Sequence, residues 1–331
     1  MKFKFFGSDN SLHLKTYAIT TTILLLSTYG GVQFYNPKTA AITTGLFLVL
    51  AAVGLVNLPQ IDRVYLVGLG VVVISLLLNL DIWRAGLARL LLMGAALGVM
   101  SLAGAITVTD LSHGLTWAGW LWPLVVLLGP GDNANILAVW PLVFLLASNS
   151  TAQKWLYGVL LIWLGSRGAI TGAAVGLAIV TGRRWGWKMI GVTGLAALLL
   201  VAWRPHTALY RLGYWAGALR GWASSPLWGV GPGGIGARGL IDQPGVAMDQ
   251  IHSHNIVISA AAELGLLGLV ALAWLAWHIW QRAGGDWQRG LIGAFAAWSM
   301  VDEPLFWPGP LLMLAVVVGC SPDQSDTEQP C

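Results

Sequence analysis

The chain has 331 residues, of which 56% are hydrophobic and only 10% are charged, and its mean hydropathy is +0.72. A soluble domain typically carries about 25% charged residues, so the composition excludes a soluble globular protein. The formal net charge of +4 is not gathered into a basic run, so we expect no nucleic-acid partner. The two cysteines, Cys320 and Cys331, lie at the C-terminus, which excludes a disulfide framework and a cysteine-based metal site.

Apolar runs separated by polar or Gly/Pro-rich breaks recur along the chain, and a bilayer-spanning helix needs roughly 20 such residues. These runs predict an all-α polytopic membrane protein with about 12 transmembrane helices. Three of the runs are short for a full span, which leaves open a count of ten or eleven with re-entrant segments. The first run is not a cleavable signal, because it is long and lacks a cleavage site. The expected spans are 16–33, 38–56, 64–81, 86–108, 114–129, 134–149, 153–165, 168–182, 187–203, 254–280, 289–301 and 304–320.

The lysines and arginines predict the orientation of these spans, because such residues are retained in short cytoplasmic connections. With the N-terminus inside, ten lie on the cytoplasmic side, and four of the other eight lie in one long loop. We therefore expect a bacterial inner-membrane protein whose long loop and active site face the periplasm. Its parts are a cytoplasmic N-terminus (1–15), helices 1–9 (16–203), the periplasmic loop (204–253), helices 10–12 (254–320) and a disordered cytoplasmic tail (321–331). Four prolines and many glycines predict short helices and turns in the loop.

The first candidate site residue is Arg167, which opens a predicted helix directly after Ser166. Helix N-termini favour anions, and a guanidinium beside one suits a phosphate or pyrophosphate. The alternative is an arginine that reaches the lipid headgroups. Gly168, Gly172 and Gly176 follow at a spacing of four, which predicts close packing of a second helix on that face.

The second group lies in the long loop, where Arg211, Tyr214 and Trp215 share one face of a helix. One cation and two aromatic rings suit a sugar or a lipid phosphate, although an interfacial aromatic belt would use the same residues. The glycine-rich stretch 229–236 that follows favours a turn over an anion-binding nest.

The third group is His252, His254 and Asn255, at the outward end of the tenth span. Histidine titrates near neutral pH and can act as a general base, which is the role we assign to His254. A metal is the rival interpretation, but the sequence shows no third ligand, so we expect no metal and no cofactor. Glu263 lies nine residues after His254, out of phase on the same helix, and we expect it to be a buried polar residue paired across helices.

Asp302 and Glu303 lie at the outward end of the eleventh span. Paired carboxylates there can bind an acceptor hydroxyl or assist a base, while a solvated loop is the more common arrangement.

In their order and spacing, these elements resemble the O-antigen ligase and O-antigen polymerase superfamily of multi-span bacterial glycosyltransferases. The resemblance covers roughly residues 160–270 and depends on four motifs: Ser-Arg-Gly at 166–168, Arg-x-x-Tyr-Trp at 211–215, Pro-Leu-Trp-Gly-Val-Gly-Pro-Gly at 226–233, and the stretch from His254 to Gly268.

The resemblance implies that a lipid-linked glycan meets an acceptor sugar beneath the long loop. It implies that Arg167 and Arg211 bind the pyrophosphate of a polyprenyl-pyrophosphate-linked donor and that His254 activates the acceptor hydroxyl without a metal. The acceptor is either lipid A core, for a ligase, or another repeat unit, for a polymerase. Tyr214, Trp215, His252, Asn255, Asp302 and Glu303 are further substrate-binding candidates. A small-anion transporter is the alternative from another class, although the sequence has no clear internal repeat.

Overall fold

The structure is a computed structural model that describes residues 48–52, 62–104, 106–128, 134–182, 191, 205–241, 252–306 and 308–320. Every labelled element in these ranges is a helix, which confirms the all-α prediction. The elements are α3 (Arg63–Leu78), η2 (Leu80–Ile82), α4 (Trp83–Ala103), α5 (Val108–Leu128), α6 (Ala134–Leu137), α7 (Val139–Ala147), α8 (Thr151–Leu164), α9 (Arg167–Val180), α11 (Pro205–Ser224), α12 (Gly234–Ala237), α13 (Ile256–Arg282), α14 (Asp286–Ser299), η4 (Pro304–Phe306) and α15 (Pro308–Gly319).

Two stretches among the described residues, Leu80–Ala103 and Ile256–Arg282, are long and apolar enough to cross a membrane. The predicted total of about 12 spans is not established by this part of the chain. The run 16–33, most of 38–56 and nearly all of 187–203 lie outside the described residues, as do the two predicted terminal segments.

The prediction of only short helices in the long loop is wrong, because α11 has 20 residues. Pro205 is its first residue, where the missing N–H costs nothing and the fixed φ suits a helix. The next proline is Pro226, so nothing breaks the helix before Ser224.

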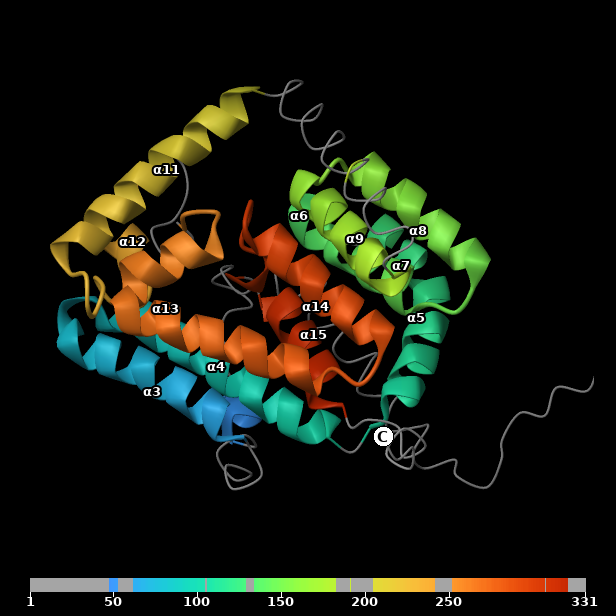
Figure 1. The fold of residues 1–331 in the computed structure, drawn as a ribbon, viewed down its shortest axis with the longest axis horizontal. Coiled ribbons are helices and arrows are strands. Elements are labelled where there is room, and N and C mark those ends of the chain that lie inside the picture. The colour runs from blue at the N-terminus through green and yellow to red at the C-terminus, as the bar shows by residue number, and fades with distance from the viewer. Residues whose placement is uncertain are drawn as a thin grey trace, which may run out of the picture.

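The helices form two groups around a central pair (Figure 1). The central helices α14 and α15 pack against α9 and α4, respectively. Helices α5, α7, α8 and α9 lie on one side, and α3, α4 and α13 lie on the other. The main core surrounds the central pair and includes the fully buried rings of Trp140, Phe144, Tyr157, Phe295 and Trp298.

The predicted close packing at Gly168, Gly172 and Gly176 is confirmed at the interface between α9 and α14. A Cβ atom at Gly172 would lie 2.6 Å from the carbonyl oxygen of Ala294, and one at Gly176 would lie 2.8 Å from that of Gly290. Only glycine lets the two backbones approach this closely, so these residues fix the distance between α9 and α14.

Replacing Gly172 with leucine is therefore expected to destabilise the protein by about 1–3 kcal/mol, because the new side chain has to push α14 away. Gly158→Leu is the matched control, since a Cβ at Gly158 on α8 meets nothing within 4 Å. Thermal unfolding in detergent measures both variants, and an equal loss in the two would contradict this account.

Helix α13 is broken at Gly265, whose φ of 69° and ψ of −159° are not helical. Residues 226–231, which we name the strap, lie against this break. The N–H of Leu266 donates to the carbonyl of Pro226 (2.8 Å), and the N–H groups of Val230 and Gly231 donate to α13 (2.8 and 3.0 Å). The strap therefore satisfies the backbone groups that the break releases, and it fixes the first part of α13 relative to α11.

Candidate active site

Two loops meet at the start of α13: residues 252–255, which lead into that helix, and residues 300–303, which follow α14. Asn255 joins them, since its side-chain oxygen accepts hydrogen bonds from the N–H groups of Val257 and Ile258 (3.0 and 3.1 Å). Its side-chain nitrogen donates to the carbonyl of Met300 (2.8 Å). One residue thus caps α13 and attaches it to the end of α14.

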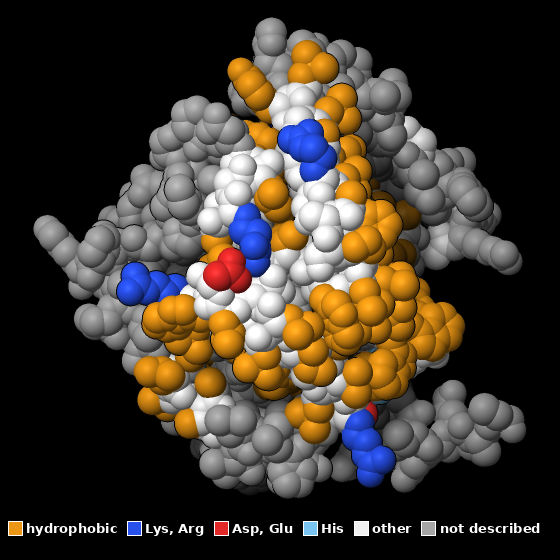
Figure 2. Space-filling model, turned by 90° about the vertical axis from the view of Figure 1, so that its left-hand side faces the viewer, with side chains coloured by type: hydrophobic (Ala, Val, Ile, Leu, Met, Phe, Trp, Pro, Cys, Tyr) orange, Lys and Arg blue, Asp and Glu red, His pale blue; other side chains and the backbone are white. Residues whose placement is uncertain are grey.

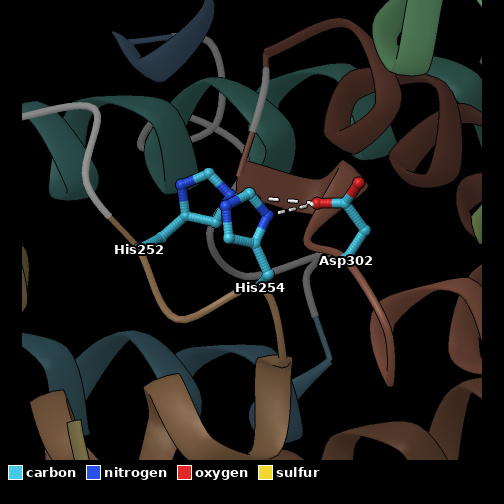
Figure 3. Close-up of side chains that lie close together, drawn as sticks. All are labelled: His252, His254 and Asp302. Atoms are coloured by element: carbon cyan, nitrogen blue, oxygen red, sulfur yellow. Dashed lines mark hydrogen bonds and ion pairs between the residues drawn. The ribbon is translucent and has the colours of Figure 1, made fainter. Parts of the chain in front are cut away.

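His254 and Asp302 form the closest pair of candidate residues (Figure 3). The His254 Nδ1 lies 2.8 Å from the Asp302 Oδ1, although the two residues are 48 positions apart. His254 has a φ of 59°, a conformation that side chains other than glycine rarely adopt and that no other described non-glycine residue shows. Such strain persists where the surroundings enforce it, and it is common at functional sites.

His252 lies beside this pair, with its ring centroid 4.3 Å from that of His254. Its Nε2 is 4.0 Å from the same Asp302 oxygen. These three side chains could hold a metal ion, since one ligand atom of each lies within 4.8 Å of the others. Asp302 is thus the possible third metal ligand that the sequence did not reveal. The 2.8 Å contact between His254 and Asp302 is the length of a hydrogen bond, so this geometry suits a shared proton.

Helix α11 brings two of the predicted residues to this pair. The Tyr214 ring stacks on the His254 ring, with centroids 5.6 Å apart, and an Nη atom of Arg211 lies 3.6 Å from the Asp302 Oδ2. Trp215 is partly buried, and its indole N–H has no hydrogen-bond partner among the described residues. The face predicted for α11 is thus turned toward the loops, with a cation and an aromatic ring over the histidine.

The Asp302 carboxylate is fully engaged by protein groups. Oδ1 accepts the N–H of Glu303 (2.9 Å) as well as contacting His254, and Oδ2 accepts the side-chain amide of Asn135 (2.9 Å) and faces Arg211. Asp302 and Glu303 are both only 5% exposed. The expectation of a solvated loop at 302–303 is therefore wrong, because the loop folds inward between α13 and α14.

This setting keeps Asp302 ionised. Burial acts to raise its pKa, but hydrogen bonds from His252 and His254 and the nearby charges of His254 and Arg211 outweigh it, so the pKa of Asp302 lies well below its usual range. A permanently negative carboxylate orients the imidazole of His254 and stabilises its protonated form.

Glu303 has the opposite character. Its pKa is raised to about 8, chiefly by burial and also by the charge of Glu263, while a hydrogen bond from Ser259 and the charge of Arg89 act against the rise. At neutral pH the Glu303 carboxyl is therefore mainly neutral and belongs to the packing beneath the site.

Replacing Glu303 with glutamine is expected to flatten the pH dependence of stability. The pKa of Glu303 is raised from 4.5 to about 8 on folding, so between these values the unfolded chain binds fewer protons and wild-type stability falls as the pH rises. Glutamine does not ionise, so the variant should gain about 1 kcal/mol or more relative to wild type by pH 8. Thermal unfolding at pH 5 and pH 8 measures this gain, and a difference that does not change with pH would contradict it.

Glu263 lies two residues before the break in α13. Its carboxylate accepts backbone hydrogen bonds from Gly233 and Ile235 and is close enough to Arg89 to feel its charge. The amides of the glycine-rich stretch thus bind a carboxylate of the protein itself. We accordingly keep Glu263 as a structural residue.

Arg167 is the first residue of α9, and the Ser166 side chain caps that helix by accepting from the N–H of Ala169 (3.4 Å). The neighbouring Gly168 lies against Trp298, whose carbonyl accepts the N–H of Asp302 (2.9 Å). Arg167 is therefore at the end of α9 nearest the loop 300–303.

Asn135 is the site residue that the sequence analysis missed. It lies in α6, within a run assigned to a transmembrane span, and its side-chain amide donates to Asp302, which is 167 positions away in the sequence. An amide at the end of an apolar run is a weak signal, but polar residues in such runs commonly mark functional sites.

Comparison with known families matches residues 153–273 to the family described as O-antigen ligase. The matched range runs from α8 past the break in α13, and it includes Arg167, Arg211 and His254. A comparison with curated proteins gave no significant match. Proteins of this family are membrane proteins with glycosyltransferase-like activity. The match confirms, over this part of the chain, the resemblance to the O-antigen ligase and polymerase superfamily that the sequence shows.

Proposed function

We propose that the protein is an O-antigen ligase-like glycosyltransferase of the bacterial inner membrane with its active site facing the periplasm. It transfers a glycan from polyprenyl pyrophosphate to an acceptor sugar such as lipid A core. The observation that carries this proposal is the contact between His254 and Asp302, with Tyr214 and Arg211 beside it.

The proposed step follows from the two nitrogens of His254. With Nδ1–H donated to Asp302, the Nε2 atom is free of a proton and accepts one from the acceptor hydroxyl. The hydroxyl oxygen forms a bond to the anomeric carbon while the bond from that carbon to the pyrophosphate breaks, and polyprenyl pyrophosphate leaves. Direct displacement of this kind inverts the anomeric centre.

The leaving pyrophosphate gains negative charge, and we assign Arg167 and Arg211 to stabilise it. Tyr214 and Trp215 offer ring faces and His252 and Asn255 offer polar groups for the sugars. Because Asp302 and Glu303 are buried and bonded within the protein, we propose that they support the site and do not contact the acceptor.

The proposal is tested with purified protein, a polyprenyl-pyrophosphate-linked glycan and candidate acceptors, in the presence of a chelator, with products resolved by size. One discrete transfer supports a metal-independent ligase, and a ladder of repeat units supports the alternative of an O-antigen polymerase. Activity that the chelator removes and a divalent metal restores would place a metal between His252, His254 and Asp302. No consumption of glycan by folded protein would favour the small-anion transporter.

Replacing Arg211 with alanine is expected to lower the transfer rate by about 10²–10³-fold, the usual loss when one group that stabilises developing charge is removed. Arg220→Ala is the matched control, since Arg220 lies on the exposed side of the same helix. Initial rates at equal amounts of folded protein measure both, and retained transfer in Arg211→Ala would refute the role assigned to this arginine.

A further inference from the structure

Helix α11 has two different surfaces. Its inner surface packs on α13 and carries Arg211 and Tyr214 to the site. Its outer surface is exposed and divides lengthwise into a polar edge and an apolar face. The polar edge consists of Tyr210, Gly213, Arg220 and Ser224. The apolar face, which we name the outer strip, repeats at intervals of three and four residues and consists of Leu209, Leu212, Ala216, Leu219 and Ala223.

The outer strip is unusually exposed for large apolar side chains: Leu209 is 64% exposed, Leu212 55% and Leu219 42%. The outer strip is not the only exposed apolar surface among the described residues, because one face along α13 also carries exposed apolar side chains. These side chains recur every three or four residues after the break in that helix, as expected for the lipid-facing side of a span, and they are Leu266, Val270, Trp274 and Trp277.

The strap connects the two apolar surfaces. The carbonyl of Pro226 accepts both the indole N–H of Trp222 on α11 (3.0 Å) and the N–H of Leu266 on α13 (2.8 Å). Leu227 and Trp228, which follow directly, are themselves exposed. Figure 2 shows hydrophobic side chains over much of this end of the molecule, with few charged ones between them.

Helix α11 packs beside the first part of α13 and is not parallel to the long part that follows the break (Figure 1). A helix that lies beside the end of a spanning helix and at an angle to its long part, with an apolar strip continuous with the lipid-facing surface and a polar edge containing an arginine, has the character of an interfacial helix. We propose that the outer strip of α11 is embedded in the leaflet on the active-site side of the bilayer. The inference rests on the proposed function for the side on which the site lies.

The consequence concerns the donor. An interfacial helix is buried about 5–10 Å into the boundary between headgroups and acyl chains. Arg211, on the opposite face of the same helix, then lies at the level of the headgroups, where the pyrophosphate of a membrane-anchored donor also lies. The bilayer thereby supports the helix that presents this arginine and sets its depth.

The test places an environment-sensitive NBD fluorophore on single cysteines in a Cys331→Ser background, where the remaining Cys320 is buried. Leu212→Cys and Leu219→Cys report on the outer strip, and Ser224→Cys on the polar edge is the matched control. The proteins are reconstituted in phosphatidylcholine vesicles with or without a nitroxide on the acyl chain. At least about twofold quenching is expected at positions 212 and 219, and little at 224.

Equally weak quenching at all three positions would overturn the inference, as would efficient cross-linking of Leu219→Cys between two copies without quenching. The transfer assay on the same vesicles separates the two proposals. Transfer without quenching of the strip refutes the embedded helix and leaves the proposed function standing. Quenching without any transfer supports the embedded helix and counts against the proposed function.

Discussion

The His254→Ala variant is expected to lose about 10²–10⁴-fold in transfer rate, the range that a positioned general base contributes. The loss follows because no other described histidine combines the contact to Asp302 with the stacked ring of Tyr214. The variant should still insert and fold, since His254 is partly exposed and alanine introduces no additional bulk at this position. Initial rates and thermal unfolding, measured on the same preparation, check both statements.

The chain offers a matched control for this variant. His278 lies on the same helix α13 and also contacts an aspartate, with its Nε2 3.1 Å from Asp62, and its ring meets that of Tyr65 edge-on. His278→Ala therefore removes a histidine–carboxylate contact of the same kind outside the site. Transfer should persist in this control. Equal loss in both variants would mean that histidine–aspartate pairs support the fold, and it would remove the catalytic role from His254.

The sequence predicted much of the local structure around the site for physical reasons. A serine followed by an arginine and spaced glycines predicted both the start of α9 and the close packing of a second helix on its glycine face, because both depend on residues within a few positions. The spacing of Arg211 and Tyr214 placed them on one face, because helical periodicity alone determines that relation. Both side chains do reach the loops.

The site as a whole could not be read from the sequence, because its centre is a long-range contact. Asp302 meets His254 across 48 residues and Asn135 across 167, and no periodicity relates such positions. Asp302 also comes after the matched domain, which ends at residue 273. The usual exposure of acidic residues favoured a solvated loop, whereas two histidines, an arginine and an amide together make the buried carboxylate stable.

The length of α11 was missed for a different reason. Prolines and glycines in 204–253 predicted turns, but their positions matter more than their number. Pro205 starts the helix, and the next proline, Pro226, comes after it has ended at Ser224. Among the glycines within it, Gly217 and Gly221 serve close packing, since a Cβ at Gly217 would lie 2.2 Å from the carbonyl oxygen of Leu240.

The Asp302→Asn variant is expected to lose about 10²–10⁴-fold in transfer rate although the shape of the side chain is preserved. The carboxylate holds the Nδ1–H of His254 and offsets the charge that His254 gains when it takes the acceptor proton. An amide supplies no charge, and its nitrogen presents a donor toward other donors, namely Arg211 or Asn135. Both effects act on the transition state, so the rate constant for transfer should fall more than the apparent affinity for donor.

The same variant carries a stability prediction with a definite sign. Folding lowers the pKa of Asp302 from its ordinary value of 3.8, so the stabilisation is fully present above that value and is lost only as the pH falls toward the folded-state pKa. Asp302→Asn should therefore be less stable than wild type at pH 7, and the difference should shrink as the pH is lowered below about 3.8. Thermal unfolding across this range measures the effect, and rates are compared below the melting temperature of the variant.

Asp81→Asn is the matched control, because Asp81 also pairs with an arginine, Arg238 at 3.0 Å, but its side chain is 60% exposed. An exposed ion pair contributes little, so this variant should keep wild-type transfer and stability to within about 1 kcal/mol. Rescue of Asp302→Asn by raising the concentration of donor would assign Asp302 to substrate binding. If the variant remains folded and its rate stays low at saturating donor, Asp302 is the residue that positions His254 and stabilises the positive charge that this base gains.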